Sequence, residues 1–239
     1  MKTKTLLISL VLSTSAMALN RPTASTPPDE AKALCSTWAK ASFKKGVNQL
    51  IVSFEGLASY SNSAAEKTYR YLDLLQNNNQ GRAPRLGNMN FVAKNLLVPQ
   101  MKQIAKDSEL LLMSENSQRE NNSVATQCVD AWSKVYGPKL KLIVLGHSFG
   151  GYAALNFATE VKKLGIEIDS MLTMDARAMP SEYKYFATPP NVAEHFNFFH
   201  KGPWMPGYAI KGAQNQKVQT DHVGVTKIDI VQETFLSLL

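Results

Sequence analysis

The segment from Leu140 to Lys163 constrains the fold more than any other part of the chain. Leu140 to Leu145 (LKLIVL) is an apolar run that predicts a buried strand, and Gly150 to Lys163 (GGYAALNFATEVKK) predicts a helix. Gly146-His147-Ser148-Phe149-Gly150, a G-x-S-x-G pattern, joins the two. Glycines lack the side chains that would obstruct a close approach of strand and helix. We therefore expect Ser148 on a sharp turn at the carboxyl end of the strand, where the N-terminus of the helix favours developing negative charge.

The rest of the chain alternates between apolar runs of strand length and amphipathic stretches of helix length. Strands are predicted at Gln49–Phe54, Glu109–Met113, Leu140–Leu145, Ile168–Met174, Phe196–Phe199 and Tyr208–Lys211. Helices are predicted at Asp29–Lys44, Ser63–Leu75, Phe91–Lys106 with a break at Pro99, from Ser123 to Gly137, Gly150–Lys163 and Lys227–Leu239. This alternation predicts an α/β fold with a mostly parallel central sheet and helices on both faces.

GHSFGG, in this strand–turn–helix context, resembles the nucleophile elbow of the α/β-hydrolase superfamily, as found in lipases, esterases and thioesterases. The resemblance covers about Gln49 to Leu239. It implies a serine nucleophile, Ser148, followed along the chain by a carboxylate and then a histidine. A serine hydroxyl needs a neutral imidazole to take its proton and a carboxylate to orient that imidazole. The connection after the predicted acid is too short to hold a large cap domain, so a minimal hydrolase is expected.

Asp175 is the predicted acid, because it directly follows the strand Ile168–Met174 and so emerges at the same sheet edge as Ser148. Most family members place this acid one strand later, and this sequence departs from that pattern. A turn-capping role is the alternative for Asp175. Asp221 is the reserve candidate for the acid.

The catalytic base is predicted to be His222, in a loop before the last helix, where the family places its histidine. His200, at the end of a predicted strand, is the competing candidate. His147 adjoins the nucleophile and should point away from it, and His195 begins the same predicted strand as His200. A surface loop histidine is the alternative reading of His222.

Two backbone N–H groups are expected to bind the oxyanion that forms when Ser148 attacks an acyl carbon. The resemblance implies Phe149, the residue after the nucleophile, and a residue of the loop after the first strand. Leu57 is preferred there, with Gly56 as the alternative.

The first eighteen residues predict a secretory signal peptide cut after Ala18, with basic Lys2 and Lys4, a short apolar run and small residues before the cut. Residues 19–46 are expected to form a tether and helix, and residues 47–239 the hydrolase domain. Loss of Lys2 and Lys4 reduces the formal charge from +7 to +5, with 24 basic and 19 acidic residues. The basic residues form no cluster, so nucleic-acid binding is not expected. The net positive charge could instead support weak contact with an anionic membrane or envelope surface. The predicted location is periplasmic or secreted.

Cys35 and Cys128 are the two cysteines, and in an exported protein they could form a disulfide; two plain core cysteines are the equal alternative. No ligand spacing typical of zinc and no phosphate-binding loop is present, so no metal and no cofactor are expected.

Aromatic and methionine side chains between Asp175 and His222 could form an apolar acyl site or could fill the core: Met179, Tyr183, Tyr185, Phe186, Trp204, Met205 and Tyr208. The expected activity is cleavage of carboxylic esters, of small molecules or lipids, through an acyl-enzyme. Thioester or amide cleavage and acyl transfer use the same residues. A non-catalytic binding protein with this fold is the alternative from another class.

Overall fold

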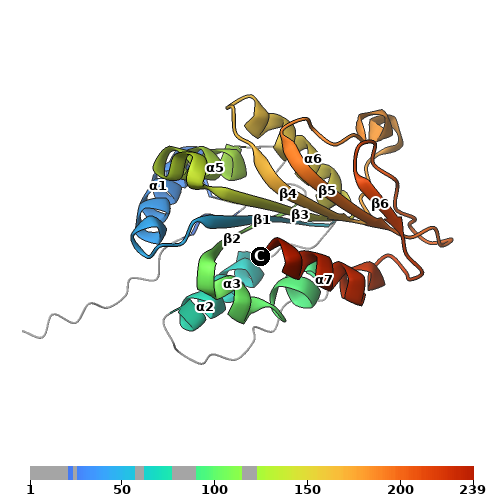
Figure 1. The fold of residues 1–239 in the computed structure, drawn as a ribbon, viewed down its shortest axis with the longest axis horizontal. Helices are drawn as coiled ribbons and strands as arrows, with labels where there is room; N and C mark the ends of the chain where they lie inside the picture. Colours follow the sequence, from blue (N-terminus) through green and yellow to red (C-terminus); the bar gives the residue numbers. More distant parts are fainter. Residues whose placement is uncertain (1–20, 24–25, 57–61, 77–89, 115–122) are drawn as a thin grey trace, which may run out of the picture.

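A central sheet of six parallel strands organises the molecule (Figure 1). The computed structural model describes residues 21–23, 26–56, 62–76, 90–114 and 123–239. Within these ranges the strand order is β2-β1-β3-β4-β5-β6. The strands are β1 (Gln49–Glu55), β2 (Ser108–Ser114), β3 (Lys141–His147), β4 (Ile168–Met174), β5 (Val192–Phe199) and β6 (Gln214–Lys217). The predicted α/β class is confirmed.

Helices cover both faces of this sheet (Figure 1). One face carries α1 (Pro28–Lys44), α5 (Ser123–Tyr136) and α6 (Phe149–Lys162). The other carries α2 (Asn62–Gln76), the π-helical turn η1 (Ala93–Leu97), α3 (Met101–Asp107) and α7 (Asp229–Leu238). None of the helices in the described ranges is both long and apolar enough to cross a membrane.

Each central strand serves two hydrophobic cores, because successive side chains point to opposite faces. In β3, Leu142 and Val144 pack in the core beneath α1, α5 and α6. Ile143 and Leu145 pack in the core formed with α2, α3 and α7. This two-sided burial explains why β3 reads as a continuous apolar run rather than an alternating one.

The strand order reverses between β1 and β3, since the chain passes from β1 outward to β2 and then returns to the other side of β1. In open parallel sheets, such a reversal leaves a crevice at the carboxyl ends of the two strands. Gly56 follows β1 and Ser148 follows β3, so both lie at this position.

Two predicted elements differ in the structure. The prediction of a strand at Tyr208–Lys211 is wrong: the sixth strand is β6, which begins six residues later, at Gln214, and its four residues are exposed and polar. Ile210 is instead a buried core residue of the preceding loop. The predicted helix 91–106 is divided near Pro99 into η1 and α3, as the missing proline N–H requires.

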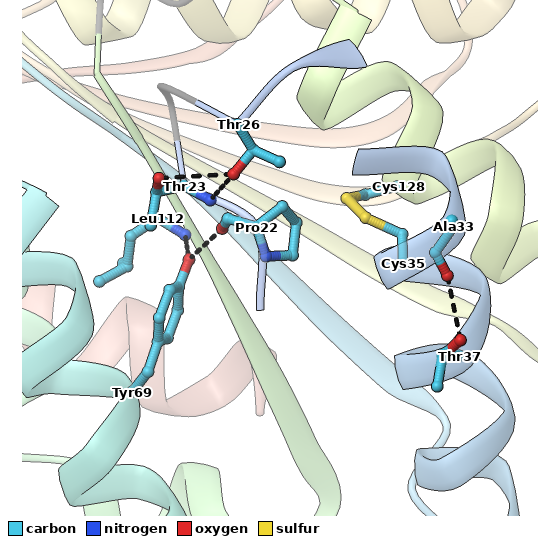
Figure 2. Close-up of a disulfide and its surroundings, with 9 residues drawn as sticks. All are labelled: Pro22, Thr23, Thr26, Ala33, Cys35, Thr37, Tyr69, Leu112 and Cys128. Atoms are coloured by element: carbon cyan, nitrogen blue, oxygen red, sulfur yellow. Dashed lines mark hydrogen bonds between the residues drawn. A yellow bond between two sulfur atoms is a disulfide. The ribbon is translucent and has the colours of Figure 1, made fainter. Parts of the chain in front are cut away.

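The segment before α1 was expected to be a tether, and its described residues are packed against the domain instead. Arg21 is buried, and its Nη2 donates to Glu109 Oε2 at 2.6 Å. Its guanidinium lies 5.4 Å from the Trp38 ring and 5.3 Å from the Tyr69 ring. Leu112, in the edge strand β2, donates its N–H to the Tyr69 hydroxyl at 2.7 Å, beside Pro22 (Figure 2). This packing covers an edge that would otherwise present unpaired backbone groups.

Cys35 of α1 and Cys128 of α5 are joined in a disulfide, with Cα atoms 4.9 Å apart (Figure 2). Trp38 and Trp132, one turn further along the same helices, meet edge to face with centroids 5.0 Å apart. The disulfide therefore links two helices that are already in contact through their buried faces.

Candidate active site

Ser148 stands on a turn whose backbone is restricted on every side. Its φ of 57° and ψ of −128° lie in a region that residues with a side chain rarely adopt. A Cβ added to Gly146 would lie 2.5 Å from the Gly150 carbonyl oxygen, and one added to Gly150 would lie 2.2 Å from that of Phe54. Only glycine fits at either position, so the two glycines of the motif hold α6 close to β1 and β3.

Three side chains predicted from the sequence form a continuous chain of hydrogen bonds. Ser148 Oγ lies 2.9 Å from His222 Nε2, and His222 Nδ1 lies 3.0 Å from Asp175 Oδ2. Asp175 is fully buried directly after β4, while the His222 side chain is 13% exposed. The ionised carboxylate can only accept, so His222 carries its proton on Nδ1 and turns the lone pair of Nε2 toward Ser148. Asp221, the reserve acid, instead accepts the N–H groups of Val223 and Gly224 in a turn.

Asp175 also has an unusual backbone, with φ of 49°. Its N–H donates to the Phe198 carbonyl of β5 at 2.7 Å, and the N–H of Ser148 donates to the carbonyl of Met174 at 3.0 Å. The Ser148 carbonyl in turn accepts from Arg177 at 2.8 Å. These backbone bonds tie the turn after β3 to the turn after β4, so that the two side chains are held in one relative position.

His147 supports the loop that carries His222. Its Nε2 donates to the His222 carbonyl at 2.8 Å, and the two ring centroids are 4.8 Å apart. Burial lowers the pKa of His147 to about 4, with the neighbouring His222 as a second cause. His147 is therefore neutral at physiological pH, and its bond to the backbone orients the loop without adding charge to the site.

The other two histidines lie on β5 or at its end. Both ring nitrogens of His195 contact threonine hydroxyls, those of Thr173 at 2.9 Å and Thr188 at 2.7 Å, and burial lowers its pKa to about 3. His200, the competitor predicted for the base, contacts Asp175 rather than the Ser148 hydroxyl. Its Nδ1 bonds Asp175 Oδ2, its backbone N–H bonds Oδ1 at 2.7 Å, and its Nε2 bonds the Trp204 carbonyl at 3.0 Å.

Gly56 lies against Ser148 at the end of β1. A Cβ added there would lie 2.9 Å from Ser148 Cβ and 3.5 Å from its Oγ. Phe149, the other predicted oxyanion residue, is the first residue of α6. Leu57 lies outside the described residues. Gly56 thus reaches the Ser148 side chain at a position where only a glycine fits without displacement.

Glu55, next to Gly56, is a buried acidic residue whose role the sequence did not reveal. Its carboxylate accepts the N–H of Val92 at 3.1 Å and that of Ala93 at 2.6 Å. Burial raises the pKa of Glu55 to about 7, against the lowering effect of these two bonds. Glu55 anchors the end of β1, which Gly56 follows directly, to the start of the helical segment at residues 91–97. An acidic residue directly at the end of an apolar strand run was the available signal.

Asp175, His200 and His222 also present ligand atoms within 4.8 Å of one another, and in the described part of the chain they are the group that could hold a metal ion. Both histidine Nδ1 atoms already contact Asp175 Oδ2 directly. An ion at that point would have to replace both hydrogen bonds and move the rings apart, so the geometry fits a proton-bonded cluster better than a metal centre.

Apart from Tyr185, whose side chain lies outside the described part of the structure, the apolar residues predicted for the substrate wall divide into two groups. Tyr183, Phe186 and Tyr208 pack with each other, the rings of Tyr183 and Tyr208 having centroids 4.1 Å apart. Met179, Trp204 and Met205 are exposed, Trp204 by 83%. The first group therefore fills the core. The second group remains accessible on loops at the carboxyl edge of the sheet.

No family model matches the chain, and no curated protein matches it.

Proposed function

We propose that the protein is a serine hydrolase of the α/β-hydrolase type that cleaves carboxylic esters through an acyl-enzyme on Ser148. The observation that carries the proposal is the hydrogen-bonded series Ser148–His222–Asp175 at the carboxyl edge of a parallel sheet, with the serine in a strained turn. The arrangement matches what a serine needs to become a nucleophile: a lone pair within hydrogen-bond reach and a carboxylate behind the imidazole.

In the first half-reaction, Ser148 Oγ attacks the acyl carbon while its proton passes to His222 Nε2. The resulting imidazolium is stabilised by Asp175, to which its Nδ1–H donates. The oxyanion is expected to accept the Phe149 N–H, with a second donor from the loop that begins at Gly56. His222 then gives its new proton to the departing alkoxide, which leaves as an alcohol.

In the second half-reaction, water attacks the acyl-enzyme, and His222 takes one proton from it. Collapse of the second tetrahedral intermediate returns that proton to Ser148 Oγ and releases the carboxylic acid. Ester, thioester and amide substrates share these steps. Competition between water and an added alcohol, followed by product analysis, distinguishes hydrolysis from acyl transfer.

The test is covalent labelling with a fluorophosphonate, which reacts with an activated serine. The wild-type protein should be labelled at Ser148, and Ser148→Ala should abolish both labelling and ester turnover. Ser53→Ala, a matched change at a buried serine in the middle of β1, should retain both. A correctly folded wild type that stays unlabelled would contradict the proposal and favour a non-catalytic binding protein.

The exposed Met179, Trp204 and Met205 support a substrate with an apolar acyl part, from a small-molecule or lipid ester. Hydrolysis rates across p-nitrophenyl esters of increasing chain length test this. A preference for acetyl over every longer chain would contradict it.

We further propose export to the periplasm or the medium and weak contact with anionic surfaces. The disulfide between Cys35 and Cys128 supports an oxidising compartment. Mass spectrometry of the purified protein should find Leu19 as its first residue, and sedimentation with anionic but not neutral vesicles tests the surface contact.

A further inference from the structure

A second histidine, His200, forms hydrogen bonds with Asp175. His200 is 2% exposed and directly follows β5. Its backbone N–H and its ring Nδ1 each bond a different oxygen of the Asp175 carboxylate. A single residue therefore holds both carboxylate oxygens, which defines the plane of the group that His222 must meet.

The partners of the His200 ring identify its protonation state. Nδ1 faces a carboxylate oxygen, and Nε2 faces the Trp204 carbonyl oxygen at 3.0 Å. Both partners accept and neither donates in the ordinary charge states of these groups. A neutral imidazole has one N–H. Its other nitrogen would carry a lone pair that faces an oxygen lone pair, and the two would repel. Only the imidazolium satisfies both contacts.

His195, which lies in β5 itself, provides the contrast. It is as buried as His200, but both of its nitrogens face threonine hydroxyls, which can donate or accept. A neutral His195 therefore satisfies both of its contacts, and burial keeps it neutral. The difference between the two histidines comes from their partners, because their exposure is nearly the same.

The loop after His200 encloses this arrangement. The N–H of Gly207 donates to the His200 carbonyl at 3.1 Å, and a Cβ added to Gly202 would lie 3.0 Å from the His200 ring. Among the described residues, Asp175 bonds the ring directly, and His222 lies near it with its ring centroid 6.2 Å away. The ammonium of neighbouring Lys201 lies instead over the Phe199 ring. The Nδ1 side of the His200 ring is thus directed at Asp175.

We propose that His200, as an imidazolium, is the positioning residue of the catalytic carboxylate: it orients Asp175, keeps it ionised for His222, and connects it to the loop at residues 201–206. This inference rests on the proposed hydrolase function. His200 acts through Asp175 and does not contact the substrate, so its loss should lower kcat and leave KM nearly unchanged.

The decisive comparison uses His200→Phe and His200→Asn. Phenylalanine preserves the ring volume and removes both side-chain donors, and it should lower kcat about 10- to 100-fold, the usual effect of losing one charge-assisted hydrogen bond. Asparagine places an N–H₂ group near the former Nδ1 and restores the hydrogen bond without the charge, so it should recover only part of the lost rate. His195→Phe, the matched control, also removes two buried contacts and should lower stability while leaving kcat unchanged. A folded His200→Phe with wild-type kcat, or a His200→Asn variant with either no recovery or full wild-type kcat, would overturn the proposal.

The charge state has its own readout in wild-type protein. Nitrogen-15 NMR of the histidine rings at neutral pH should show protons on both nitrogens of His200 and on one nitrogen each of His147 and His195. A neutral His200 would overturn the proposal even if every variant were unfolded. The two proposals fail separately, because a wild type that neither labels nor hydrolyses esters refutes the hydrolase, whereas the NMR result does not depend on turnover.

Discussion

Gly207→Ala should disable the site without a change to any of its functional side chains. A Cβ at this position would lie 2.4 Å from Asp175 Oδ1 and 2.8 Å from Asp175 Cα. The first distance is about 1 Å shorter than an ordinary contact between carbon and oxygen. The φ of Gly207 is not positive, so alanine meets no conformational barrier of its own. The collision with Asp175 is therefore the main effect of the substitution.

Asp175 cannot move by 1 Å and keep its bonds, because both of its oxygens are held by His200 and one also accepts from His222. A misplacement of about 1 Å in an active site typically costs about 100-fold in rate. We expect kcat for p-nitrophenyl ester hydrolysis and the rate of fluorophosphonate labelling to fall by about that factor. Overpacking should also lower the stability by about 1 to 3 kcal/mol.

Gly165→Ala is the control for this experiment. Gly165 follows α6 with φ of 70° and has nothing within 4 Å of an added Cβ. Alanine there should cost about 1 kcal/mol of stability through backbone strain and leave kcat unchanged. If Gly207→Ala folds and retains wild-type kcat, then Asp175 is not the group that orients His222.

Three further predictions concern the framework around the site. Removing the disulfide with Cys35→Ala and Cys128→Ala should lower the free energy of unfolding by about 2 to 4 kcal/mol and leave kcat of the folded protein unchanged. A thiol assay of the wild-type protein should find free thiols only after reduction. Arg21→Met should cost about 3 to 5 kcal/mol because it leaves Glu109 buried without its cation, and adding Glu109→Gln should recover part of the loss in urea unfolding. The pKa of Glu55 is about 7 in the folded protein and 4.5 in its unperturbed state. Between these pH values the folded protein therefore keeps a proton on Glu55 that the unfolded chain has lost. The contribution of Glu55 to the free energy of unfolding should decrease by on the order of 3 kcal/mol as the pH rises from 4.5 to 7. Urea unfolding of Glu55→Gln should lack that decrease, and parallel curves for wild type and variant would contradict it.

Much of the site could be predicted because parallel strands deliver their carboxyl ends to one edge. Ser148 and Asp175 each follow an apolar run directly, and that placement alone brings them together. The role of His200 depends on register: Met174 pairs with Phe198, which sets the residues just beyond both strands side by side. A sequence does not give that register. β6 was missed for a different reason, since an exposed edge strand of polar residues has no apolar pattern.

The burial of Arg21 was equally hidden, because a charged residue beside prolines is typical of a solvated segment. Its cation is stabilised by Glu109 and by the Trp38 and Tyr69 rings, which come from three separate elements. Such a site exists only after the domain has folded. Local composition therefore predicts that Arg21 is exposed, whereas its tertiary contacts bury it.

The strain at Ser148 leads to a last prediction, in which glycine at this position gives a more stable fold than alanine. A residue with φ of 57° and ψ of −128° costs about 1 to 3 kcal/mol, and glycine adopts that conformation without penalty. Glycine also makes the unfolded chain more flexible, which offsets about 0.5 to 1 kcal/mol of the gain. Ser148→Gly should therefore be more stable than Ser148→Ala by about 1 kcal/mol. Both variants lack Oγ, so their difference isolates the backbone. Equal urea midpoints would show that the turn after β3 stores no strain, and the sharp turn would then be a consequence of packing alone.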